Sequence, residues 1–174
     1  MTWTTYHNRA EILRTVMAVA DERRDGLLPM DVEGVVEKFD DELGLLGTLQ
    51  LKWHTRLAGR IEQELNDQPM DLESAVVRAW QQTAAEMPGV RAILDHYRSE
   101  PVDARMAETM AKAHAKEHLL LAVMAGKGAY SDELAVPAGA AIEERARASY
   151  RPLGPVPAQR GTSLLGRIKA ALAA

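Results

Sequence analysis

Apolar side chains recur along most of this chain at the three- and four-residue spacing that places them on one face of an α-helix. Residues 5–24 illustrate the pattern, with apolar positions at Ile12, Leu13, Val16, Val19 and Ala20. Only 5% of the residues are aromatic, whereas Ala, Leu, Glu, Arg and Met, which favour helices, are abundant. Because strands prefer β-branched and aromatic residues, this composition argues against a sheet and predicts an all-α fold.

Short breaks divide the helical pattern into five predicted helices within residues 1–150. We expect helices over residues 5–24, 31–65, 71–97, 103–126 and 131–150. Pro88-Gly89 breaks or kinks the third. The second and third follow two similar segments, in which Asp31 and Asp71 are expected to cap the helix N-termini. Since short turns join the neighbours, we expect an antiparallel bundle of about five helices.

A Pro/Gly-rich linker, residues 151–161, separates the bundle domain, residues 1–150, from the last part of the sequence. Residues 162–174 are predicted to form a short amphipathic tail helix. The candidate partner-binding residues on this tail are Leu164, Leu165, Arg167, Ile168 and Leu172. An extended linker followed by a short amphipathic helix is typical of a docking peptide.

Charge is distributed unevenly along the chain. All 25 acidic residues lie at or before Glu144, and six of the 21 basic residues follow it. The first 144 residues therefore carry 25 acids against 15 bases, a net charge of −10, and the rest carry +6. A basic tail on an acidic body indicates an interaction, either with a partner or with the acidic body itself.

Several classes of site and location are excluded by what the sequence lacks. No Cys is present, which rules out disulfides, thiolate metal sites and Cys nucleophiles. No signal peptide is recognisable and the longest apolar run, residues 119–126, is too short to span a bilayer, so we expect a cytoplasmic protein without membrane contact. Phosphate-loop, dinucleotide-binding and nucleophile-elbow motifs are absent. The basic tail is too short and too poor in aromatic residues to predict nucleic-acid binding.

One constellation, in the predicted helix 103–126, can carry chemistry. Glu117 falls within an apolar stripe, and His114 and His118 flank it one helical turn apart. Two imidazoles at positions i and i+4 can share a divalent ion, with Glu117 as a further ligand or a base. His54, on the inward side of residues 31–65, is a candidate third imidazole if the two helices are neighbours. The ion would be zinc, iron, manganese or nickel, and no other cofactor is predicted.

Two families use parts of this pattern. His54 together with the His114-x-x-x-His118 pair is similar to the arrangement in DinB-like metal bundles, which include thiol-dependent transferases. The residues around His54, from Gln50 to Arg56, differ from that family's pattern, so membership is not predicted. His114-x-x-Glu117-His118 also matches the inverted zinc-protease motif, but that family needs a large α/β domain, which this chain is too small and too helical to form.

Glu117 also has a structural interpretation. A carboxylate in an apolar stripe needs a partner, which an Arg, a His or Gln50 across the bundle can provide. Because no strong catalytic motif is present, we expect a non-enzymatic interaction or adaptor protein that binds a protein partner or self-associates. The alternative is a metal-binding helical enzyme or sensor that uses His54, His114, Glu117 and His118.

Overall fold

The computed structural model describes residues 3–129 and 134–151, with side chains from residue 9 onward. All regular secondary structure in this part of the chain is helical, which confirms the all-α prediction. It contains seven helices rather than about five: α1 (Trp3–Arg23), α2 (Val35–Phe39), α3 (Glu42–Asn66), α4 (Leu72–Glu86), α5 (Pro88–Ser99), α6 (Ala104–Met124) and α7 (Ala135–Ser149). None of the helices in these ranges has the length and apolarity needed to cross a membrane. The linker after Arg151 and the tail helix 162–174 lie outside the described residues.

The predicted helix 31–65 is wrong as a single element. Residues 31–34 form turns, and α2 begins after Gly34, whose φ is +84°, so Asp31 does not cap a helix. Asp40 then has a φ of +63°, which ends α2. The side chain of Asp41 accepts a hydrogen bond of 2.7 Å from the backbone N–H of Gly44 and caps α3. The positive φ of Asp40 and the cap at Asp41 thus separate α2 from α3.

The other helix starts agree better with the sequence. Asp71 caps α4 by accepting from the backbone N–H of Ser74 at 3.0 Å, as predicted. Asp103 caps α6 in the same manner, with 2.7 Å to the N–H of Met106. Pro88 occupies the first turn of α5, where its missing N–H costs nothing, so it separates α4 from α5 instead of kinking one helix.

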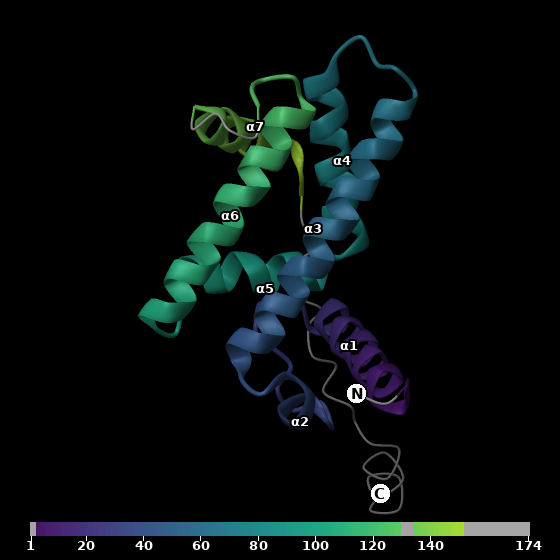
Figure 1. Ribbon diagram of the computed structural model, residues 1–174, viewed down its shortest axis with the longest axis vertical. Coiled ribbons are helices and arrows are strands. Elements are labelled where there is room, and N and C mark those ends of the chain that lie inside the picture. The colour runs from purple at the N-terminus through teal and green to yellow at the C-terminus, as the bar shows by residue number, and fades with distance from the viewer. Residues whose placement is uncertain (1–2, 130–133, 152–174) are drawn as a thin grey trace, which may run out of the picture.

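The helices form two close pairs and one crossing layer. α3 packs along α4, and α6 packs along α7. α5 packs against α1 and runs across α3 and α6 at a steep angle, so the helices do not all lie side by side as in a simple bundle (Figure 1). Trp53 from α3 and Trp80 from α4 are fully buried at the centre, with their rings edge to face 5.8 Å apart.

A glycine permits the close approach of α6 and α7. A Cβ atom built on Gly139 would overlap the backbone carbonyl group of His118. The two helix backbones are therefore in direct contact at this point. Glu143 lies one turn after Gly139, so the crossing brings its side chain to the face of α6 that carries His114 and His118.

We expect Gly139→Ala to destabilise the protein by about 1–3 kcal/mol, because the added methyl group forces α6 and α7 apart. The matched control is Gly59→Ala in α3, where a Cβ has no atom within 4 Å. That change should stabilise the helix by up to about 1 kcal/mol, since Ala is the better helix former. Urea denaturation of both variants measures the difference, and equal effects of the same sign would contradict the close crossing.

Candidate functional site

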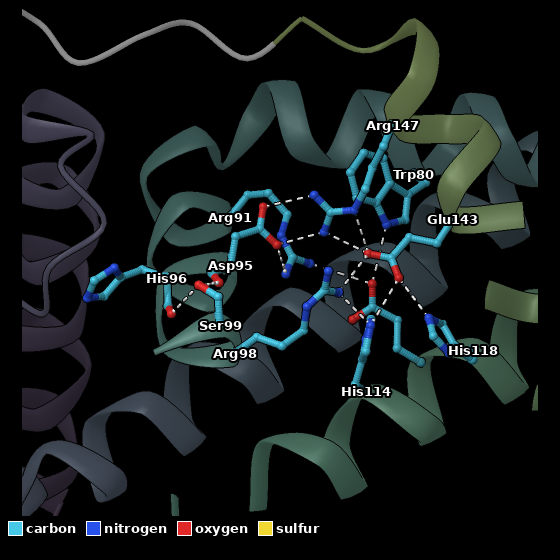
Figure 2. A network of polar contacts seen from close by, with 11 residues as sticks. Trp80, Arg91, Asp95, His96, Arg98, Ser99, His114, His118, Glu143 and Arg147 are labelled. Carbon is cyan, nitrogen blue, oxygen red and sulfur yellow. Dashed lines mark hydrogen bonds and ion pairs between the residues drawn. The ribbon is translucent and has the colours of Figure 1, made fainter. Parts of the chain in front are cut away.

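A network of charged side chains lies between α5, α6 and α7 (Figure 2). α5 contributes Arg91, Asp95 and Arg98, α6 contributes His114, Glu117 and His118, and α7 contributes Glu143 and Arg147. Three guanidinium groups thus face three carboxylates, with two imidazoles at one side. Equal numbers of opposite charges allow these groups to be removed from water together.

His114, His118 and Glu143 form the cluster in this network that can hold a metal ion. Their nearest ligand atoms all lie within 4.8 Å of one another. Glu143 Oε2 is 2.7 Å from His118 Nε2 and 3.2 Å from His114 Nε2. The two imidazoles stand one helical turn apart on α6, with ring centroids 4.0 Å apart. The predicted pair of histidines is therefore close together, and it is joined by a carboxylate from α7.

Arg98 approaches the same three residues from α5. Its Nη1 lies 2.5 Å from His114 Nε2 and 3.3 Å from Glu143 Oε1. Because a guanidinium can only donate, His114 accepts this hydrogen bond through an unprotonated Nε2. The side chain of Arg98 is 36% exposed, whereas that of Glu143 is 4% exposed. Arg98 thus lies on the side of the cluster that faces solvent.

Arg147 fixes the other side of Glu143. Its Nε donates to Glu143 Oε1 at 2.8 Å. Its two terminal nitrogens donate to the two carboxylate oxygens of Asp95, at 2.9 and 2.6 Å. Such a two-pronged guanidinium–carboxylate pair holds both groups in a fixed orientation. Asp95 also accepts a hydrogen bond from Arg91 at 2.8 Å within α5, and its pair with Arg147 joins α5 to α7.

The surroundings keep Glu143 charged and His114 neutral. Burial alone would raise the pKa of Glu143, but the hydrogen bond with His118 and the charge of Arg147 outweigh it and hold that pKa far below its usual range. Burial lowers the pKa of His114 from 6.5 to about 4, although the charge of Glu143 opposes this. At neutral pH both groups are in the form that binds metal ions.

Glu117 is a partnered carboxylate in the core. It is 1% exposed, accepts a hydrogen bond from Trp80 Nε1 at 3.3 Å, and lies 3.6 Å from Arg91 Nη1. The guanidinium of Arg91 stacks over the ring of Trp53, 4.6 Å from its centroid. These contacts match the structural interpretation given to Glu117, with Arg91 and Trp80 as the partners.

His54 lies apart from the cluster. It lines a groove of about 530 Å³ between α3 and α6, together with Leu51, Lys112 and Lys116. In the described part of the chain, the group of side chains close enough to share one ion consists of His114, His118 and Glu143, and His54 is not among them. The structure therefore does not bring His54 together with the other predicted ligands.

Sequence reasoning missed Glu143, Arg98 and Arg147. A signal for Glu143 exists, because Ala135, Gly139, Ile142 and Ala146 form the buried stripe of α7 and Glu143 falls within it. A charged residue in such a stripe, with Arg147 four positions later, indicates a buried ion pair. The position of Arg98 depends on the crossing of α5 over α6, which no local pattern contains.

Comparison of the chain with protein-family models, with curated proteins and with solved structures found no match. The function of the site is therefore inferred from its own geometry.

The structure does not describe the predicted partner-binding residues of the tail, which are Leu164, Leu165, Arg167, Ile168 and Leu172.

We expect Asp95→Asn to lower the free energy of unfolding at pH 7 by about 2 kcal/mol. This is less than for a fully buried ion pair, because the side chain of Asp95 is one-third exposed and water screens its charge. Burial raises the pKa of Asp95, but Arg147 and Arg91 outweigh it, so the folded-state pKa lies below the ordinary 3.8. A depressed pKa stabilises the fold above the unfolded value and loses that effect as pH falls through the folded value. The difference between wild type and variant should therefore shrink below about pH 4. Denaturant melts from pH 7 to 3 test this, and a pH-independent difference would contradict it.

Proposed function

We propose that this chain is a metal-binding helical protein that holds one divalent ion with His114, His118 and Glu143. The observation that carries this proposal is the convergence of two imidazole nitrogens and a carboxylate oxygen within 4.8 Å. This set differs from the predicted one, because Glu143 replaces Glu117 as the carboxylate and His54 is not included.

The chemistry of the donor set suits a first-row transition metal. Imidazole and carboxylate together bind zinc, iron, manganese and nickel, and two histidines with one carboxylate occur in both zinc and non-haem iron sites. Arg147 supports this arrangement, since it holds Glu143 Oε1 and leaves Oε2 directed at both imidazoles. Hydrogen-bonded second-sphere groups of this kind orient ligands.

Three protein ligands leave coordination positions open for water or a small molecule. A bound ion would supply Lewis acidity or an activated water there. The side chains of His114 and His118 are 21% and 12% exposed, so a small molecule can approach the edge of the cluster. Both an enzyme and a metal sensor fit these features. The cytoplasmic location expected from the sequence stays a prediction.

We expect the wild-type protein, purified without chelator and reconstituted with Zn²⁺, to hold about one ion per chain. His118→Ala should weaken Zn²⁺ binding about 100-fold or more, because it removes one of the ligands. The matched control is His54→Ala, which removes an imidazole outside the cluster and should leave the affinity unchanged. Elemental analysis and calorimetric titration measure both. The proposal fails if wild type binds no stoichiometric ion or if the two variants bind equally.

The adaptor role is a second candidate, favoured by an acidic groove between α1 and α2. The groove has a volume of about 540 Å³ and is lined by apolar and charged residues, Lys38 included; its carboxylates are Glu11, Glu33 and Glu37. The tail 162–174 has apolar and basic residues and no acidic ones, so its charge is complementary. Tyr150, where the bundle domain ends, lies near Arg24 at the C-terminal end of α1. The eleven linker residues, 151–161, can span about 36 Å when extended, more than the length of about 18 Å along α1 from Glu11 to Arg23.

If the tail 162–174 occupies this groove, reversing the groove's charge should release it. Glu33→Lys together with Glu37→Lys should make the tail more susceptible to limited proteolysis with trypsin, by about tenfold in rate. Glu22→Lys with Glu62→Lys is the control, since neither residue lines the groove. Equal cleavage of wild type and both variants would contradict this role. Concentration-dependent protection would indicate that the tail of a second copy is bound.

A further inference from the structure

We propose that the guanidinium of Arg98 supplies the positive charge of the cluster when no metal ion is bound. A metal ion that binds there displaces this guanidinium. The displaced guanidinium then binds an oxyanion ligand of the ion. The oxyanion is a carboxylate or phosphate group of a small molecule. This inference rests on the proposed metal site and adds to it a place for Arg98 and a class of ligand.

The first step is the arrangement of atoms around His114 Nε2. This nitrogen lies 2.5 Å from Arg98 Nη1 and 3.2 Å from Glu143 Oε2. Since it accepts from Arg98, it carries no proton to share with the carboxylate, and two electron-rich atoms face each other. A positive charge beside both of them is needed to make this arrangement favourable. Arg98 provides that charge in the free protein, since its guanidinium contacts His114 Nε2 and the other carboxylate oxygen, Glu143 Oε1. A metal ion between His114 Nε2 and Glu143 Oε2 would supply the positive charge instead.

The second step is that Arg98 is the cation of the network that can leave. Arg91 is 6% exposed in its side chain and is held by Asp95 and the ring of Trp53. Arg147 is held by the two oxygens of Asp95. Arg98 is 36% exposed, and within the described residues its guanidinium contacts His114 and Glu143. An ion bound by those two residues would occupy His114 Nε2, the nitrogen that accepts from Arg98, would withdraw charge from the Glu143 carboxylate, and would repel the guanidinium.

The third step is the fate of the displaced guanidinium. It would remain on the last turn of α5, beside His114 and Glu143. A guanidinium binds carboxylates and phosphates through two parallel hydrogen bonds. An oxyanion with one oxygen on the ion and others on Arg98 would restore a partner to the arginine and neutralise part of the added charge. The geometry therefore favours anionic ligands over neutral ones.

Cobalt(II) provides a direct test, because its visible absorption reports ligands at the ion. We expect Arg98→Met to bind Co²⁺ about tenfold more tightly than wild type, since the competing charge is gone. Acetate or inorganic phosphate added to Co²⁺-loaded wild type should change the spectrum in a saturable manner, and Arg98→Met should need about tenfold more anion. Arg56→Met, which removes an exposed arginine paired with Glu86, is the control and should match wild type.

The outcomes separate this inference from the proposed function. If wild type binds Co²⁺ through His118 and Glu143 but Arg98→Met has the same metal and anion affinities, the inference is wrong and the metal site stands. If neither protein binds Co²⁺, both are wrong. A response to acetate alone assigns a carboxylate ligand, and a response to phosphate alone assigns a phosphate. Arg98→Gln, which keeps polarity without charge, gives the same comparison if the Met variant does not fold.

Discussion

Pairing of buried charges links α5, α6 and α7. α5 and α7 share no close backbone contact in the described residues, and the pairs Arg147–Asp95 and Arg98–Glu143 connect them. Each carboxylate in the network faces at least one guanidinium, so removing one member leaves its partner charged and poorly solvated. An apolar replacement of any single residue is therefore costlier here than at the surface. These polar links add to the buried apolar residues that hold α5 in its steep crossing.

Local patterns in the sequence predict much of the fold. The helical composition, the cap at Asp71, the start of a helix near Asp103 and the adjacency of His114 and His118 are all properties of short segments. The break at Asp40 was missed because apolar residues continue at helical spacing across it, and only the positive φ and the cap on Asp41 reveal it.

The candidate site was only partly predictable, because its members meet through tertiary packing. Glu143 reaches the histidines through the crossing at Gly139, and Arg98 reaches them across the helix layer. The network contains the partnered carboxylate Glu117, and the metal site that we propose lies beside it. The fully buried side holds Glu117 and Arg91, and the solvent-facing side holds the two imidazoles. The proposed ligand site and the buried ion pairs thus belong to one network.

Two indole rings lie against this network, and that gives the molecule an internal optical probe. Trp80 donates a hydrogen bond to Glu117, and the guanidinium of Arg147 lies over its ring, 4.9 Å from the centroid. The guanidinium of Arg91 lies over the ring of Trp53. The energy of an excited indole depends on the electric field across its ring, and here that field comes from charges that also set the orientation of Glu143. We therefore expect the fluorescence of Trp53 and Trp80 to respond to changes in the charge network, in addition to the signal of Trp3.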